Sequence, residues 1–261
     1  MKIYVVCDIE GVAGVIDHRL QCWEDGAYYQ QARRLATLEL NALVEGALEG
    51  GAAEIIAWDG HCLFPGSVDP ELVHPECKLV MGAGDDGPAG LDGSFDALLQ
   101  CGLHAMSGTP GALMSHGGWE LNGKKIGEIG ASAVIAGHRG VPFVFISGDQ
   151  AAVEEAKALV PGVEAVAVKE ALSARVTGMS QAPAISLSPQ KAREMIREGA
   201  KRAMGRIGEI EPLRFEPPYV LKWQFQTAKG ADDMRAAHPE ARRVDPVTLE
   251  FKSNDFAELP L

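Results

Sequence analysis

The sequence predicts an α/β protein: a layered α/β/α domain with a central, mostly parallel or mixed sheet, plus a smaller C-terminal α/β portion. Short apolar runs typical of buried strands recur along the chain, and segments with helical periodicity lie between them. Strands that alternate with helices form such layers, and functional residues are expected in the loops after the strands. The pattern changes after about residue 172, so we divide the chain into a larger α/β domain, 1–174, and a C-terminal α/β subdomain, 175–261.

Five runs are predicted as strands because they are short, rich in Val, Ile or Leu, and followed by polar or glycine residues. They are residues 2–8, 53–59, 97–104, 141–149 and 163–169. Leucines and alanines at helical spacing predict a helix within 26–49, and a Pro-Gly pair ends a second helix over 151–160. Asn122-Gly123 predicts a β-hairpin, after which residues 128–137 can continue as a helix.

The C-terminal portion is expected to begin with a helix. In SLSP, Ser188 is suited to cap the helix and Pro189 to occupy its first position. An apolar stripe from Met195 to Ile207 supports this helix. The later runs EPPYVLKWQFQ and VTLEFKSND are predicted to form strands around a short helix.

Composition narrows the class of protein. The formal net charge of −12 argues against a nucleic-acid partner, because phosphate contacts need clustered Lys and Arg. No apolar run is long enough to span a membrane, and the chain enters its first strand without a signal peptide. The five cysteines are widely spaced without a CxxC pair, which is typical of reduced thiols. We therefore expect a cytoplasmic protein with neither nucleic-acid nor membrane partners.

Carboxylates and imidazoles gather where the predicted strands end and in the glycine-rich segments between them. They are Asp8, Glu10, Asp59, His61, His104, His116 and Glu128. The C-terminal ends of parallel strands lie along one edge of a sheet, so these side chains can meet there. Mixed carboxylate and imidazole ligands are typical of an open catalytic site for zinc or another divalent transition metal, which predicts that 1–174 is the metal-binding catalytic domain. Alternation along the strand would place Asp8 and Glu10 on one side, and one carboxylate can bridge two ions.

Each of these residues also has a simpler interpretation. DIEG can be a surface turn, His61 and His104 can be hydrogen-bonded structural histidines, and Glu128 can be an acid at a helix N-terminus. We interpret Asp59 as capping a turn. The remaining histidines lack a comparable position and are interpreted as surface or packing residues; they are His18, His74, His138 and His238.

Four segments in order, DIEGVAG, WDGH, GLHAMSGTPGALMSH and GEIG, resemble the DppA-type D-aminopeptidases, the M55 family of zinc peptidases. The resemblance is dense in the N-terminal half and continues more weakly beyond it. It implies a dinuclear zinc aminopeptidase that hydrolyses an N-terminal residue, a D-amino acid, from short peptides or simple amides by a metal-bound hydroxide. It also implies a cytoplasmic homo-oligomer, a decamer.

The resemblance further implies a role for each site residue. Asp8 would be shared by two zinc ions, and the other ligands would be Glu10, His61, His104 and Glu128. His116 matches the catalytic histidine. We expect His116 to transfer a proton or stabilise the oxyanion, because zinc-activated water already supplies a nucleophile.

Two other functions remain open at this point. A DxE motif on a strand also begins the two-metal 3′–5′ exonucleases, but their sites are nearly all carboxylate because Mg²⁺ prefers oxygen ligands. The two candidate histidine ligands and the net charge of −12 argue against this function. The second alternative is a non-catalytic dipeptide-binding protein, for which an open metal site with an additional histidine is more than binding requires.

Overall fold

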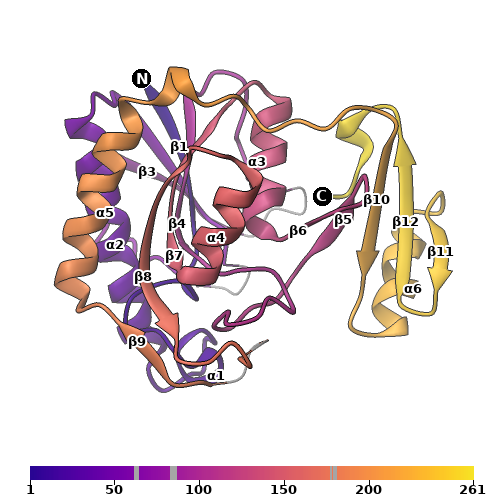
Figure 1. Cartoon of the computed structure of the whole chain (residues 1–261), viewed down its shortest axis with the longest axis horizontal. Helices are drawn as coiled ribbons and strands as arrows, with labels where there is room; N and C mark the ends of the chain where they lie inside the picture. The colour runs from indigo at the N-terminus through magenta and orange to yellow at the C-terminus, as the bar shows by residue number, and fades with distance from the viewer. Residues whose placement is uncertain (62–64, 83–86, 177, 179–180) are drawn as a thin grey trace.

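The larger part of the protein is a seven-stranded sheet between two layers of helices (Figure 1). The computed structural model describes residues 1–61, 65–82, 87–176, 178 and 181–261. The strands in spatial order are β3 (Cys77–Val80), β2 (Glu54–Asp59), β1 (Lys2–Cys7), β4 (Ala97–Leu103), β7 (Phe143–Asp149), β8 (Glu164–Ala171) and β9 (Ala184–Ser186). Only β9 is antiparallel to its neighbour. The predicted layered α/β fold with a mostly parallel sheet is confirmed.

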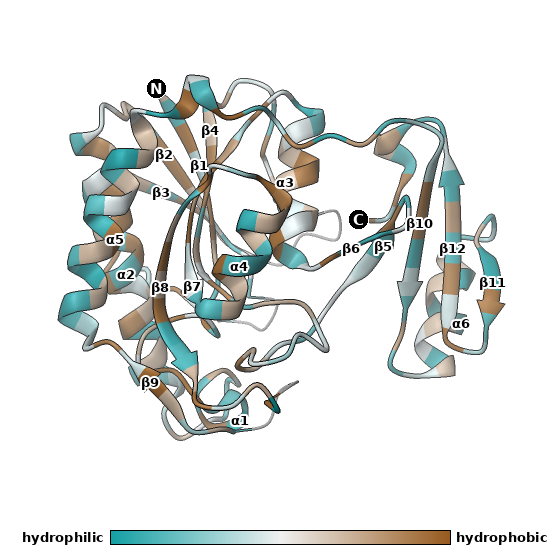
Figure 2. Cartoon of the chain, viewed as in Figure 1, coloured by the Kyte–Doolittle hydropathy of each residue, from teal (hydrophilic) through white to brown (hydrophobic). Residues whose placement is uncertain are grey.

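Two pairs of helices cover this sheet. The first pair, α2 (Tyr29–Glu49) and α5 (Pro189–Met204), packs on one face, and α3 (Glu128–His138) and α4 (Gln150–Leu159) pack on the other. The α2–α5 contact depends on Gly46, where an added Cβ would lie 2.1 Å from the Arg197 carbonyl oxygen. Strands β4 and β7 are buried along their whole length. Figure 2 shows hydrophobic residues along β8 and hydrophilic residues on α5.

A smaller antiparallel sheet lies beside the larger part, at the right of Figure 1. Its strands in spatial order are β11 (Arg242–Asp245), β12 (Thr248–Ser253), β10 (Tyr219–Gln224), β5 (Trp119–Leu121) and β6 (Lys124–Ile126). Helix α6 (Ala228–Ala237) packs against β12. The predicted hairpin is β5–β6, and Asn122 and Gly123 both have the positive φ that a two-residue hairpin turn requires.

The two sheets use chain from both sides of residue 174. Beyond that residue, β9 and α5 complete the larger part, whereas the earlier β5–β6 hairpin pairs with β10 in the smaller sheet. The predicted boundary at residue 174 therefore does not coincide with the division between the sheets. Local sequence patterns show where an element forms, but they do not show which distant strand it joins.

The remaining elements are short. Two single turns of 3-10 helix, η1 (Ile207–Glu209) and η2 (Phe256–Glu258), lie in the C-terminal part. Helix α1 (His18–Gln21) follows β1, and neither it nor β3 was predicted because each has only four residues. Within the described ranges, no helix combines the length and the apolar character needed to cross a membrane.

Candidate active site

The site lies where the order of the parallel strands reverses. From β1 the chain continues to β2 and β3 on one side, whereas β4, β7 and β8 follow on the other side. Loops that leave two neighbouring strands in opposite directions form a crevice in which α/β proteins bind ligands. Gly11 allows the loop after β1 to lie directly on the end of β4, since an added Cβ would be 2.1 Å from the Leu103 carbonyl oxygen.

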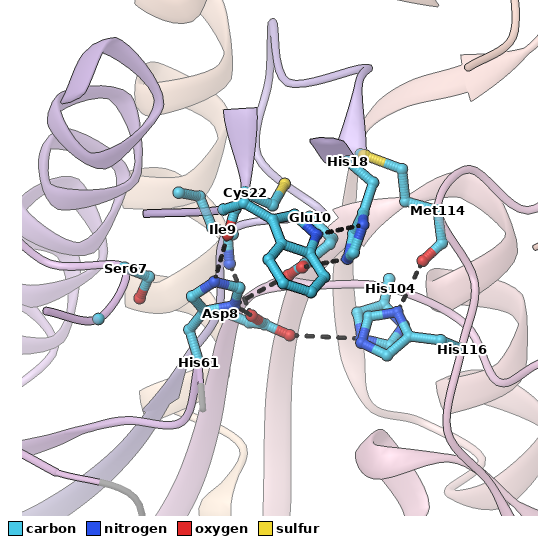
Figure 3. A network of polar contacts seen from close by, with 12 residues as sticks. Asp8, Ile9, Glu10, His18, Cys22, His61, Ser67, His104, Met114 and His116 are labelled. Carbon is cyan, nitrogen blue, oxygen red and sulfur yellow. Dashed lines mark hydrogen bonds and ion pairs between the residues drawn. The ribbon is translucent and has the colours of Figure 1, made fainter. Parts of the chain in front are cut away.

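Asp8 and Glu10 are buried in this crevice, with exposures of 6% and 1%. Strand β1 ends at Cys7, so both acids lie in the following turn, and alternation along a strand is the wrong reason for their common orientation. The turn is held by backbone hydrogen bonds to the neighbouring β4, from Asp8 N to Cys101 O at 2.9 Å and from Gly11 N to Gly102 O at 2.7 Å. Both carboxylates nevertheless face the imidazole of His61 (Figure 3).

His61, after β2, contacts both acids. Its Nδ1 lies 3.3 Å from Asp8 Oδ1 and 3.6 Å from Glu10 Oε2. Its Nε2 lies 2.8 Å from the Cys22 carbonyl oxygen, which can only accept, so Nε2 carries a proton. In the neutral ring, Nδ1 therefore directs its lone pair at the carboxylates. An imidazole that donates one N–H to a carbonyl while the other nitrogen faces acids is arranged like a metal ligand.

His104, after β4, is arranged in the same way with its nitrogens exchanged. Its Nδ1 donates to the Ala105 carbonyl oxygen at 2.9 Å. Its Nε2 lies 3.5 Å from Asp8 Oδ2 and 3.5 Å from Glu128 Oε2. The two oxygens of Asp8 thus face two different histidines.

Glu128 and His116 complete the cluster. Glu128 is the first residue of α3, so it is both an acid at a helix N-terminus and a partner of His104. His116 Nδ1 donates to the Met114 carbonyl oxygen at 2.9 Å, its Nε2 lies 3.9 Å from Glu128 Oε1, and its ring stacks on His104 with centroids 3.9 Å apart. Gly117 has a φ of +65°, which favours glycine, and an added Cβ would displace Glu128 Oε1, which is 2.6 Å away.

Several buried polar atoms of the cluster lack hydrogen bonds. Among the residues that the structure describes, the two carboxylate oxygens of Glu10 and Nε2 of His104 are buried without a hydrogen-bond partner. Leaving such groups unsatisfied costs free energy that a bound cation would recover. Three sets offer ligand atoms within 4.8 Å of one another: Asp8, Glu10 and His104; His104, His116 and Glu128; and Glu10, His18 and His116. Imidazole nitrogens with carboxylate oxygens suit zinc and related divalent metals.

The protonation of the metal-free cluster follows from burial and close pairing. Burial, and then the nearby Glu10, raise the pKa of Asp8 to about 8. Burial opposes charge on His61 and His104, yet the surrounding carboxylates raise the pKa of both rings above the ordinary value. Against the effect of burial, His61 lowers the pKa of Glu10. Protons on the rings therefore balance the carboxylates, and a divalent cation would replace them.

His18 belongs to this site, so its interpretation as a surface or packing residue is wrong. Its Nε2 lies 3.6 Å from Glu10 Oε1, and its ring centroid is 5.6 Å from that of His116. The indole N–H of Trp23 can only donate, and it donates to His18 Nδ1 at 3.0 Å. The proton of neutral His18 is therefore on Nε2, directed at Glu10, which is the reverse of a ligand tautomer. Its position in the loop after the first strand was the available signal.

Other interpretations agree with the structure. Asp59 closes a turn, accepting hydrogen bonds from Ser67 N and Oγ on Oδ1 and from Val68 N on Oδ2. His138 is a packing residue whose ring stacks on Phe256 with centroids 3.8 Å apart. Neither side chain is among the three candidate ligand sets.

Lys169 is a second residue that the sequence did not indicate. It lies on β8, is 3% exposed, and its ammonium group donates to the backbone carbonyls of Glu10, Val12 and Val15. Burial lowers the pKa of this lysine. Lys169 therefore holds the loop that carries Glu10 against the sheet, and the only signal for it was a lysine at the end of the apolar run VEAVAVK.

Lys169→Met is expected to lower the free energy of unfolding by about 3–5 kcal/mol, because three carbonyls lose their donor in a buried position. Urea unfolding of the metal-free protein measures this loss, and hydrogen exchange should increase over residues 10–15. The matched control is Lys157→Met, an exposed lysine on α4. Equal stability of the Lys169 and Lys157 variants would show that the three hydrogen bonds do not hold the loop.

Comparison with known proteins identifies a family and a relative of known structure. The family model of the M55 peptidases, described as D-aminopeptidase, matches residues 1–260. The chain is 29% identical over 269 residues to the D-aminopeptidase of Bacillus subtilis (strain 168), covering 99% of this chain and 93% of that protein. It also matches the solved structure of the Zn-dependent D-aminopeptidase DppA from Bacillus subtilis, described as a self-compartmentalizing protease, with a TM-score of 0.88, 29% identity and the same coverage of 99% and 93%.

These matches confirm the resemblance seen in the sequence, and they favour a peptidase over the exonuclease and the non-catalytic binding protein. Because the family model matches nearly the whole chain, the protein belongs to the M55 peptidase family, the D-aminopeptidases.

Proposed function

We propose that the protein is a dinuclear zinc aminopeptidase that removes the N-terminal residue, a D-amino acid, from short peptides or simple amides. The observation that carries this proposal is the buried cluster in which unpartnered Glu10 oxygens and His104 Nε2 face other ligand-type atoms. The zinc dependence of the similar Bacillus subtilis enzyme supports the choice of metal.

The two oxygens of Asp8 support a pair of ions. Oδ1 faces His61 and Oδ2 faces His104, so Asp8 can bridge two metals. One ion would be held by Asp8, Glu10 and His61, and the other by Asp8, His104 and Glu128. Bound zinc supplies a Lewis acid for the substrate carbonyl and lowers the pKa of water.

The protein's own groups orient the substrate and move the proton. A carboxylate of the cluster attracts the free amine of the peptide, which limits cleavage to the first residue. Met114 O fixes the proton of neutral His116 on Nδ1, so Nε2 can accept a proton from the attacking water and return it to the leaving amine. Trp23 holds the proton of His18 on Nε2, which lies 3.6 Å from Glu10 Oε1.

Metal analysis together with peptide hydrolysis tests this function. Protein purified without chelator is analysed by mass spectrometry for metal content and assayed on D-Ala-D-Ala and L-Ala-L-Ala. About two zinc ions per chain with cleavage of the D-dipeptide supports the proposal. Cleavage of L-Ala-L-Ala alone would overturn its stereochemistry, and absence of bound transition metal would overturn the metal centre.

His61 and His104 are protonated in the metal-free cluster. Zinc binding is therefore expected to release about two protons per chain at pH 7. Affinity for zinc should therefore fall as the pH is lowered. Calorimetric titration in buffers of different ionisation enthalpy measures the number of protons released. A pH-independent affinity would contradict the protonation described for the metal-free rings.

Assembly forms the last part of the proposal. The similar Bacillus subtilis enzyme is described as self-compartmentalizing, which supports a homo-oligomer for this chain, and we propose a decamer. Native mass spectrometry of the zinc-loaded protein tests the number of subunits. Location in the cytoplasm stays a prediction from the sequence.

A further inference from the structure

A cavity of about 620 Å³ opens beside His116, between the larger part of the protein and the smaller sheet. Trp119, Trp223 and Phe225 line it with half-buried rings. The centroids of Trp119 and Trp223 are 5.6 Å apart, and Trp223 stacks on Phe225 at 4.8 Å. The cavity thus has an aromatic wall that begins close to the candidate catalytic histidine.

The charge of the lining differs from that of the chain. Lys125 and Lys222 line the cavity together with one acid, Glu120, whereas the whole chain has a formal net charge of −12. Lys222 Nζ is paired with Glu120 at 2.7 Å. Lys125 lies opposite Glu120 across the β5–β6 hairpin and is exposed. The lining therefore carries an excess of positive charge, which is suited to a carboxylate.

The backbone between the catalytic cluster and the aromatic wall has no side chains. Gly117 and Gly118 follow His116 directly, and both have positive φ. A Cβ at Gly117 would contact Glu128 at 2.6 Å. Both glycines also line the cavity, so the chain between His116 and Trp119 presents only backbone to it.

We propose that this cavity binds the part of the substrate that follows the cleaved bond. It selects short peptides in which the residue after that bond has an aromatic or bulky apolar side chain and the chain ends in a free carboxylate. The proposal rests on the aminopeptidase function proposed above. If the substrate amine lies at the acidic cluster, the rest of the peptide passes His116 into the cavity, where its side chain stacks on Trp223 and its carboxylate faces Lys125.

Rates of hydrolysis for three substrates test the selection: D-Ala-D-Phe, D-Ala-Gly and the C-terminal amide of D-Ala-D-Phe. The zinc-loaded wild-type protein is expected to have a kcat/KM about tenfold higher for D-Ala-D-Phe than for D-Ala-Gly, because the phenyl ring can stack on the aromatic wall. Trp223→Ala should reduce this preference to about one by lowering kcat/KM for D-Ala-D-Phe. Phe225→Ala, beside it, should reduce the preference in part, and it serves as the test if Trp223→Ala does not fold.

Lys125→Gln tests the carboxylate contact. It is expected to lower kcat/KM for D-Ala-D-Phe about threefold, which is the effect of losing an exposed ion pair. The kcat/KM for the C-terminal amide should not change. The matched control is Lys124→Gln on the same hairpin, since Lys124 is exposed and is not among the residues lining the cavity. Equal losses for the free acid and the amide, or an equal effect of Lys124→Gln, would overturn the assignment of Lys125.

Binding to the metal-free protein separates this proposal from the proposed function. Calorimetric titration is expected to show tighter binding of D-Ala-D-Phe than of D-Ala-Gly, with the difference lost in Trp223→Ala. If D-Ala-amide is cleaved but the two dipeptides react and bind equally, the cavity proposal is overturned and the proposed function stands. If no peptide is cleaved but D-Ala-D-Phe still binds more tightly, the proposed function fails, and what stands is a cavity that binds an aromatic peptide without a cleaved bond beside it.

Discussion

Asp8→Asn is expected to lose zinc and to lower hydrolytic activity by more than about a thousandfold, since metal catalysis supplies several kcal/mol of transition-state stabilisation. Asp8 faces both His61 and His104, so its loss affects both proposed ions at once. Metal content by mass spectrometry and kcat/KM on D-Ala-D-Ala measure the two effects. Asp233→Asn, at an exposed aspartate on α6, is the matched control. Full zinc content in Asp8→Asn would contradict the bridging role.

The same substitution should stabilise the metal-free protein. The pKa of Asp8 is raised from 3.8 to about 8 by burial and by Glu10, so the ionised carboxylate is unfavourable in the folded state. An acid whose pKa is raised in the folded state lowers the stability of the protein at high pH. This cost disappears as the pH falls toward the pKa of the same acid in the unfolded chain. Because Asn carries no charge, Asp8→Asn removes this cost. Each gain of about 1 kcal/mol in the free energy of unfolding raises the melting temperature by about 2–4 °C for a chain of this size.

Calorimetry in the presence of chelator tests this stabilisation. The melting temperature of Asp8→Asn should exceed that of the wild type at pH 8.5, and the difference should shrink at pH 5. A lower melting temperature at pH 8.5 would show that the ion pair between His61 and Asp8 outweighs the repulsion between the two buried acids. Asp8→Asn is thus expected to raise the stability of the metal-free protein and to lower hydrolytic activity. This combination is expected of a carboxylate whose role is to bind metal.

His116→Ala is expected to lower kcat by about 10²–10⁴-fold while zinc content stays at the wild-type level. His116 Nε2 is 3.9 Å from Glu128, and its side chain is 28% exposed, so it lies at the edge of the ligand cluster. Its removal takes away the proton acceptor without removing Asp8 or His61. His238→Ala, remote from the site, is the control for removal of an imidazole.

Two results would contradict this role of His116. Wild-type turnover in His116→Ala would show that the proton is handled elsewhere, and loss of zinc would make His116 a ligand. The dependence of kcat/KM on pH is an independent measurement. The ionisation of a basic group that the wild-type profile shows should be absent from the profile of the variant.

Much of the fold was predictable because its signals are local. Ser188 accepts a hydrogen bond from Lys191 N and Pro189 is the first residue of α5, as capping chemistry predicted. Asn122-Gly123 forms the turn of β5–β6. The ends of the first five predicted strands lie within two residues of the observed ones, because short apolar runs mark buried strands wherever the chain later places them.

The sequence by itself also indicated a metal cluster, and the resemblance to the M55 peptidases implied its five ligands. Five acids and imidazoles at strand and helix ends meet in one cluster because parallel strands place their C-terminal ends on the same edge of the sheet; they are Asp8, Glu10, His61, His104 and Glu128. Rules that relate the end of a strand to the edge of a sheet need no knowledge of the partner strands.

Only the tertiary structure decided which distant residues complete the site. Lys169 reaches the loop of Glu10 across 159 positions of the chain, and the β5–β6 hairpin pairs with β10 across the predicted boundary at residue 174. The proton on His18 depends on Trp23, and no spacing of residues indicates a tautomer. These features arise from hydrogen bonds and packing between separate segments, whose geometry exists only after the chain has folded.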